Sequence, residues 1–364
     1  MQRSGLSSCL LGLALSYASA EAASAQCDPH EWQADEAFWQ SDVMSDESVV
    51  MIAPASGGLP EAPLLWPATE IVSVRDSSLA VELERDVDWT YEDGVLRLTE
   101  GSHAASVREA DLRSSGQPRF EENHWYHTVQ LAVTYRHEPG LWRGPLPGAG
   151  LERLRAKLVP GAQITLAILG DSISVGYSAS GHGTTDFEPA APYLMPWPTV
   201  VSCRLQQRYG VSVALNNASV AGTTSAWGRS VANDAVAVTQ PDVVAIAFGM
   251  NDAAYEVSPG SFGANIQAMI DVLRAARADT EIVLIAPMLA NPGWSCAGDQ
   301  RLYLPVLREV AARNAAVLVD MTTTHEALLA RKRYVDMTGN GLNHPNDFLS
   351  RWYGYLVSAA INGD

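Results

Sequence analysis

Two patterns of hydrophobic positions divide the chain. From about residue 47 to 137, apolar and polar residues alternate with a period of two, as in "SSLAVELERDVDWTYEDGVLRLTEGS" (77–102) and "HTVQLAVTYRHE" (127–138). This alternation is typical of half-buried strands, and residues 91–94 (YEDG) separate two apolar runs as a hairpin turn does. The pattern predicts a small antiparallel β-sandwich domain.

The pattern changes after about residue 150. Continuous apolar runs appear, and they alternate with stretches of helical periodicity such as 261–279 and 299–314. Runs that are apolar on both faces predict strands of a parallel sheet covered by helices on each side, so we expect an α/β domain with three α/β/α layers. The predicted strands are 164–170, 211–217, 243–249, 281–287 and 316–320.

The segment between the two patterns, "EPGLWRGPLPGAG" (138–150), is rich in Gly and Pro, as linkers and surface crossovers are. The chain of 364 residues is long enough for two domains. The predicted division is a signal peptide at 1–25, a β-sandwich domain at 26–137, a linker at 138–160 and an α/β domain at 161–364.

The N-terminus has the features of an export signal. Arg3 precedes a short apolar core at 9–15, and the small-residue triplets 18–20 and 23–25 offer cleavage sites. The apolar core is too short to cross a bilayer, and no later stretch is long enough, so we expect no transmembrane segment. The sequence predicts a secreted or periplasmic protein.

Cysteine usage fits an oxidising compartment. Removal of the signal takes away Cys9 and leaves Cys27, Cys203 and Cys296. One disulfide is expected, and we favour Cys203–Cys296 because both residues lie in the second half of the chain. Lipidation of Cys27 is a weaker alternative, since Gln26 is a poor residue before a lipidated cysteine.

Charge and motifs exclude several classes of partner. The formal net charge of −17 repels phosphate backbones, so we expect no nucleic acid. There is no CxxC pair and no phosphate-binding loop, and we expect neither a metal nor a cofactor.

Three candidate motifs lie at the ends of predicted strands. Ser172 follows strand 164–170 directly, and taken alone it is better explained as a helix N-cap than as a nucleophile. Gly222 lies after strand 211–217, where it is either a turn residue or a bare N–H that approaches a reacting oxygen. Asn251 follows strand 243–249, where it is either turn chemistry or an amide donor.

The fourth motif is "DMTGNGLNHPND" (336–347), before the last predicted helix. His344 lies in this Gly/Asn/Pro loop, and Pro345 keeps the residue before it out of helix. A loop after the last strand can carry a side chain back over the carboxyl edge of the sheet, where ligands bind in such folds.

Together "GDSIS" (170–174), the Gly222 stretch, "GMND" (249–252) and "NHPND" (343–347) resemble, in order and strand context, the four blocks of the SGNH, or GDSL-type, serine hydrolases. The resemblance covers roughly residues 160–364. It implies a serine ester hydrolase in which Ser172 is the nucleophile and His344 the general base. The implied oxyanion hole consists of the Ser172 N–H, the Gly222 N–H and the Asn251 side-chain amide.

One position departs from the family pattern. The family places an Asp three residues before the histidine, and this chain has Gly341 there. Asp336 is the weakly favoured residue to orient His344, and Asn340, Asp347 or a backbone carbonyl are the alternatives.

The region 141–181 also resembles two-domain bacterial esterases that carry an N-terminal β-sandwich, some of which remove acetyl groups from polysaccharides. This favours an ester substrate on an acetylated carbohydrate. The alternatives are a lipase-like or arylester hydrolase of short acyl chains, and a glycan-binding module with an inactive hydrolase-like scaffold. Trp125 and Tyr126 either contact a sugar or belong to the sandwich core. The loops 182–198 and 289–300 are expected at the rim of the site.

Overall fold

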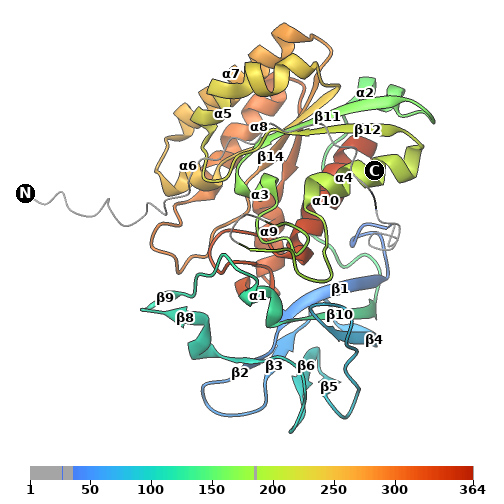
Figure 1. The fold of residues 1–364 in the computed structure, drawn as a ribbon, viewed down its shortest axis with the longest axis vertical. Coiled ribbons are helices and arrows are strands. Elements are labelled where there is room, and N and C mark those ends of the chain that lie inside the picture. Colours follow the sequence, from blue (N-terminus) through green and yellow to red (C-terminus); the bar gives the residue numbers. More distant parts are fainter. Residues whose placement is uncertain (1–26, 28–35, 184–186, 364) are drawn as a thin grey trace, which may run out of the picture.

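The computed structural model describes Cys27, residues 36–183 and residues 187–363. The predicted signal peptide lies outside these residues. Figure 1 shows a larger part built on a central sheet with helices around it, and a smaller part made of short strands from the first half of the chain.

The larger part is built on five parallel strands, and their order in the sheet is β12–β11–β13–β14–β15. Every predicted strand is present, with ends that differ from the prediction by no more than two residues. Their bounds are β11 (Gln163–Gly170), β12 (Ser212–Asn217), β13 (Val243–Ala247), β14 (Glu281–Ala286) and β15 (Val317–Asp320).

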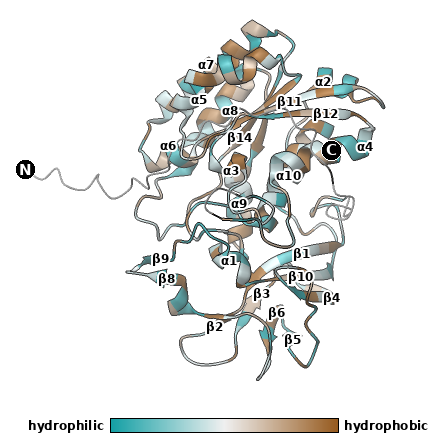
Figure 2. Cartoon of the chain, in the orientation of Figure 1, coloured by the Kyte–Doolittle hydropathy of each residue, from teal (hydrophilic) through white to brown (hydrophobic). Residues whose placement is uncertain are grey.

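Both faces of this sheet are buried. Successive side chains of a strand point to opposite faces, and in these strands both sets pack in hydrophobic clusters. Ile168 of β11 packs in one cluster with Trp197 and Trp352, and the next residue, Leu169, packs in another cluster with Ile266. Figure 2 shows hydrophobic residues along these strands. The predicted three-layer α/β/α arrangement is confirmed.

Helices cover the two faces. On one face lie α5 (Ser225–Val231), the π-helical turn η2 (Ala232–Val236), η3 (Ala237–Thr239), α7 (Pro259–Ala276) and α8 (Tyr303–Arg313). On the other lie α2 (Glu152–Lys157), α4 (Trp197–Tyr209), α9 (Met321–Leu329) and α10 (Asp347–Asn362). Shorter elements at the ends of strands are α3 (Ser172–Val175), α6 (Met250–Ala254), η4 (Gln300–Leu302) and η5 (Tyr334–Asp336).

The smaller part consists of small, mainly antiparallel sheets. One has the order β1–β10–β4, a second has the order β5–β6–β3–β2–β7 with a parallel β2–β7 pair, and β8 pairs with β9. The bounds are β1 (Val43–Val50), β2 (Ile52–Ala53), β3 (Glu61–Pro63), β4 (Ala68–Asp76), β5 (Trp89–Glu92), β6 (Val95–Leu98), β7 (Val107–Arg108), β8 (Arg113–Ser114), β9 (Gln117–Pro118) and β10 (Gln130–His137), with the short helices η1 (Glu109–Leu112) and α1 (Trp125–Thr128).

The predicted hairpin is present between β5 and β6. Glu92 pairs with Val95, and the two residues between them, Asp93 and Gly94, have φ angles of 52° and 83°. Two consecutive positive φ values are what a two-residue type I′ hairpin turn requires.

A buried ion pair joins the two parts. Nζ of Lys332, which follows α9, contacts Oε1 of Glu47 on β1, and both side chains are fully buried. The Tyr135 hydroxyl donates to the other oxygen of Glu47 at 2.5 Å, and Lys332 also donates to the Ser48 carbonyl at 2.9 Å. Many hydrophobic residues of the smaller part form one continuous cluster with those on one face of the larger sheet.

Residues within the predicted linker pack on the larger part. Leu154 of α2 is buried, and its N–H donates to Oε2 of Glu281 at 2.6 Å. The Lys157 side chain forms an ion pair with Asp242 at 2.6 Å. The limits of the two domains stay a prediction.

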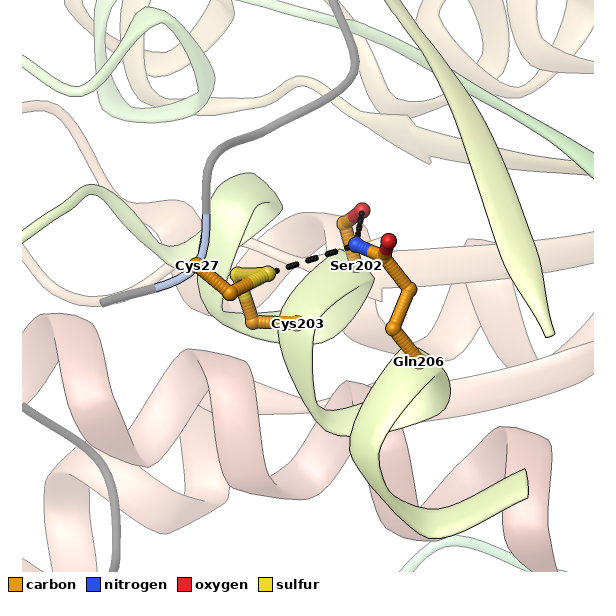
Figure 3. The surroundings of a disulfide bond; sticks show 4 residues. All are labelled: Cys27, Ser202, Cys203 and Gln206. Atoms are coloured by element: carbon orange, nitrogen blue, oxygen red, sulfur yellow. Dashed lines mark hydrogen bonds between the residues drawn. A yellow bond between two sulfur atoms is a disulfide. The ribbon is translucent and has the colours of Figure 1, made fainter. Parts of the chain in front are cut away.

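The predicted Cys203–Cys296 disulfide is wrong, because Cys203 of α4 is bonded to Cys27 (Figure 3). The pairing ties a residue near the start of the chain to the helical layer that also contains α10. None of the helices in the part of the chain that the structure describes is long and apolar enough to cross a membrane.

We expect peptide mapping of the unreduced protein to recover a Cys27–Cys203 crosslink. Because the bond joins residues separated by 176 positions, its loss is expected to lower the free energy of unfolding by up to about 5 kcal/mol. The measurement is the Tm of the Cys27→Ser, Cys203→Ser double variant against the wild type. A Cys203–Cys296 peptide in the map would contradict the pairing.

Candidate active site

Ser172 lies at the junction between the first strand of the sheet and a short helix. β11 ends at Gly170, and Asp171 is the N-cap of α3, because its Oδ1 accepts a hydrogen bond from the Ile173 N–H at 3.0 Å. The alternative that Ser172 caps the helix is therefore wrong. Ser172 is the first residue of the helix, where backbone N–H groups have no partner within the helix.

His344 contacts Ser172. Its Nε2 atom lies 2.9 Å from the Ser172 Oγ, and both side chains are buried. The two residues are far apart in the sequence, since Ser172 follows β11 and His344 lies just before α10. The fold thus brings together the residues that the sequence predicted as nucleophile and base.

Asn340 shapes the loop that carries His344. Its Oδ1 accepts hydrogen bonds from the N–H groups of Leu342, Asn343 and His344 at 3.0 to 3.1 Å. Thr338 donates its hydroxyl to the His344 carbonyl at 3.0 Å. Asn340, one of the alternatives for orienting the imidazole, therefore acts on the backbone of the loop.

The carboxylate beside His344 belongs to Glu122, which precedes α1 in the smaller part. Nδ1 of His344 and Oε2 of Glu122 lie 3.3 Å apart, within ion-pair range but without the alignment of a good hydrogen bond. Oε1 of Glu122 accepts a hydrogen bond from Asn340 at 3.2 Å. Burial raises the pKa of Glu122, but the attraction of His344 and the hydrogen bond from Asn340 outweigh it, and the pKa is lowered overall.

The prediction that Asp336 orients His344 is wrong. Both oxygens of Asp336 are held by Arg333, and one of them also accepts the Val50 N–H of β1 at 2.8 Å. The alternative Asp347 accepts the Ser180 N–H at 2.8 Å. Both carboxylates serve structural contacts elsewhere.

The sequence carries no specific signal for Glu122. It is the second of two acidic residues before the aromatic pair Trp125–Tyr126, within the predicted β-sandwich. Its approach to His344 depends on how the smaller part docks on the larger, which periodicity does not predict.

Gly222 lies in the loop after β12, and Asn251 is the second residue of α6, which follows β13. The strands β12 and β13 lie on either side of β11, which ends just before Ser172. Asn251 Nδ2 donates to the Thr223 carbonyl at 2.9 Å, and the Val220 N–H donates to the Gly170 carbonyl at 3.1 Å. The segment after β12 is therefore hydrogen-bonded both to α6 and to the end of β11. The predicted donors to an oxyanion thus come from adjacent segments at the carboxyl edge, and their role stays a prediction.

Ionisable groups surround the serine–histidine pair. Burial raises the pKa of Asp171 to about 7, and the nearby Asp252 adds to this, against the hydrogen bond from Ile173 and the charge of His344. Burial lowers the pKa of His182, and His344 lowers it further. The Tyr177 ring packs against both histidines, with centroids 5.4 Å from His182 and 5.5 Å from His344.

The smaller part also holds the predicted rim loop at 182–198. His124 and His127, from the start and the body of α1, hydrogen-bond through Nε2 to the carbonyls of Glu188 and Ala191, each at 2.7 Å. The segment around α1 therefore borders the active site as well as the β-sheets.

Of the two aromatic residues in α1, one belongs to the core. Tyr126 is fully buried, and its hydroxyl donates to the Arg119 carbonyl at 2.7 Å. Trp125 is half-buried, and the Arg119 guanidinium lies 4.0 Å from the centroid of its ring.

A parallel sheet with both faces covered, and a buried serine in contact with a histidine at its carboxyl edge, define the SGNH type of α/β/α domain. The chain belongs to the GDSL-like lipase/acylhydrolase family, whose model matches residues 168–349. The resemblance inferred from the motifs is confirmed, and the family indicates an ester hydrolase. Ser172, Gly222, Asn251 and His344 lie inside the matched residues, and Glu122 lies outside them.

Several solved structures are similar to part of this chain. A two-domain esterase (CEX) active on acetylated mannans is 22% identical, with a TM-score of 0.46 over 58% of this chain and 51% of its own, so this chain matches about half of its length. A lipase/acylhydrolase from Enterococcus faecalis is 25% identical, with a TM-score of 0.44 over 55% of this chain and 96% of its own. Axe2, an acetylxylan esterase from Geobacillus stearothermophilus, is 18% identical, with a TM-score of 0.45 over 56% and 96%. No curated protein sequence matches the chain.

We expect Asp336→Asn to reduce stability much more than catalysis. The change removes a fully buried carboxylate charge from Arg333, and breaking such a pair typically costs about 3 kcal/mol. The measurements are Tm, and kcat/KM on p-nitrophenyl acetate at a temperature where the variant is folded. A sharp loss of kcat at unchanged Tm would instead show that Asp336 takes part in catalysis.

Proposed function

We propose that the protein is an exported serine esterase in which Ser172 is the nucleophile and His344 the general base. The observation that carries the proposal is the 2.9 Å contact between His344 Nε2 and Ser172 Oγ. A serine hydroxyl attacks a carbonyl well only when a base accepts its proton, and this distance is within the range for that transfer.

In the first half of the reaction, His344 takes the hydroxyl proton while Ser172 attacks the ester carbonyl. The resulting oxyanion is stabilised by the Ser172 and Gly222 N–H groups and by the Asn251 amide. Each such donor typically contributes about 3 kcal/mol to the stabilisation of the transition state.

In the second half, the imidazolium of His344 donates its proton to the departing alcohol, and an acyl group stays on Ser172. A water molecule, deprotonated by His344, then attacks the acyl carbonyl; the bond from Ser172 Oγ to the acyl carbon breaks, His344 returns its proton to Oγ, and the acid leaves. The enzyme returns to its starting state.

We propose an acetylated carbohydrate as the substrate. The support is the half-buried Trp125, which begins α1 three residues after Glu122. A flat aromatic ring at the rim suits the apolar face of a sugar. The same ring accommodates an aryl ester or a short acyl chain, so these remain the alternative substrates.

We propose export on two grounds. The first is the predicted signal at 1–25. The second is the Cys27–Cys203 disulfide, a bond that persists in oxidising compartments and is rare in the cytosol.

Ser172→Ala is expected to abolish hydrolysis of p-nitrophenyl acetate and labelling by a fluorophosphonate probe, because no other group takes the acyl chain. The matched control is Ser174→Ala, which removes a buried hydroxyl from the same short helix and should leave labelling intact. Persistent labelling of Ser172→Ala would overturn the assignment of the nucleophile.

For the substrate, we expect acetate release from acetylated polysaccharides, and kcat/KM that falls as the acyl chain of p-nitrophenyl esters lengthens. Activity that rises with chain length would favour the lipase-like alternative. Glycan binding without turnover of any ester would favour the binding module with an inactive scaffold.

A further inference from the structure

We propose that Glu122 of the smaller part positions His344, so that the β-rich part of the chain completes the catalytic machinery of the α/β part. The inference rests on the proposed function, since it assigns the third member of a Ser172–His344 site. The family match at 168–349 does not include Glu122.

The contact places a carboxylate on the side of the imidazole ring that faces away from the serine. Glu122 Oε2 faces Nδ1 of His344 at 3.3 Å, while Nε2 of the same ring faces Ser172. Both Oε2 and Nδ1 are buried and neither has a hydrogen-bond partner among the described residues, although a third of the Glu122 side chain is exposed. The carboxylate is therefore aimed at the imidazole.

Gly341 explains why the acid comes from another part of the chain. It occupies the position where the family has its aspartate, and a Cβ placed there would lie 2.0 Å from the Arg119 carbonyl oxygen and 2.4 Å from the Tyr126 hydroxyl oxygen. Its φ of +88° also disfavours any residue with a side chain. The segment that contains Glu122 thus fills the space where the family's aspartate would lie.

The same segment is anchored to the His344 loop. The Glu121 N–H donates to the Asn340 carbonyl at 3.2 Å, and the Asn340 side chain donates to Glu122. Asn340 in turn holds the His344 N–H. One residue therefore connects the backbone of the histidine to the carboxylate beside its ring.

A carboxylate at Nδ1 has two effects. It favours the tautomer with the proton on Nδ1, which leaves Nε2 free to accept the serine proton, and it stabilises the imidazolium that forms in the transition state. The other ionisable groups that face His344 are Asp171 at the start of α3 and His182 in the loop after it, with the Tyr177 ring packed between the histidines. All three are unchanged in a Glu122 variant, so a difference from the wild type reports on Glu122.

The test is Glu122→Gln, a change of charge with little change of shape. We expect kcat/KM on p-nitrophenyl acetate to fall by at least about tenfold. We also expect the acid limb of the pH–rate profile to move to lower pH, because loss of a negative neighbour disfavours protonation of His344. Glu122→Asp, which keeps the charge, should restore the wild-type position of the acid limb.

The matched control is Glu121→Gln. That carboxylate pairs with Arg119 at 2.9 Å and accepts from Asn123, so its loss should leave the acid limb in place. Equal shifts of the acid limb in the Glu121 and Glu122 variants, or a folded Glu122→Gln variant with wild-type rate and pH profile, would overturn the proposal.

An NMR titration of the His344 imidazole, assigned with His344→Ala, gives a readout that needs no turnover. A lower protonation midpoint in Glu122→Gln supports the contact even if no ester is hydrolysed, and an unchanged midpoint overturns it. Failure of the esterase function would instead be seen as wild-type protein that neither hydrolyses esters nor reacts with the fluorophosphonate.

Discussion

The buried ion pair between Lys332 and Glu47 is the contact on which the arrangement of the two parts depends. Both side chains are fully enclosed, and a charge left without its partner in such a place costs several kcal/mol. A docking shifted by even a few ångströms would separate the pair, so we interpret it as a determinant of the docking geometry. The hydroxyl of Tyr135 donates to the remaining oxygen of Glu47 and further restricts the position of the Glu47 carboxylate.

From Lys332 onward, the chain lies against the smaller part until α10 begins. Asp336 accepts the Val50 N–H, and the Asn346 amide donates to Ser48 and Gln130. His344 lies inside this stretch, so the position of the candidate base is set by strands β1 and β10 as much as by the parallel sheet. This accounts for a site that lies where the two parts meet.

Local sequence patterns predicted most of the fold. The five parallel strands and the β5–β6 hairpin followed from periodicity and turn residues, because burial on one or both faces leaves a direct trace in the sequence. Ser172, Gly222, Asn251 and His344 followed from motifs at strand ends. The group behind His344 did not, because Glu122 reaches it only through contacts between distant segments.

The same limit explains the other differences. Asp336 carries the expected charge at a plausible distance along the chain, but η5 turns it toward Arg333 and β1. Cys203 had a nearer partner in sequence, yet the packing of Cys27 on α4 decides the pairing. In each case a long-range contact that no local pattern records selects between chemically equivalent residues.

The pairing of Glu122 with His344 has a consequence for biosynthesis. The carboxylate belongs to residue 122, whereas the histidine is residue 344, so all five strands of the parallel sheet lie between them in the sequence. Contacts between such distant segments form late, because the loop between them must first be closed. In a growing chain, Ser172 and the β-strands are therefore made long before His344, and the contacts that join Ser172, His344 and Glu122 form only after the His344 segment has been synthesised.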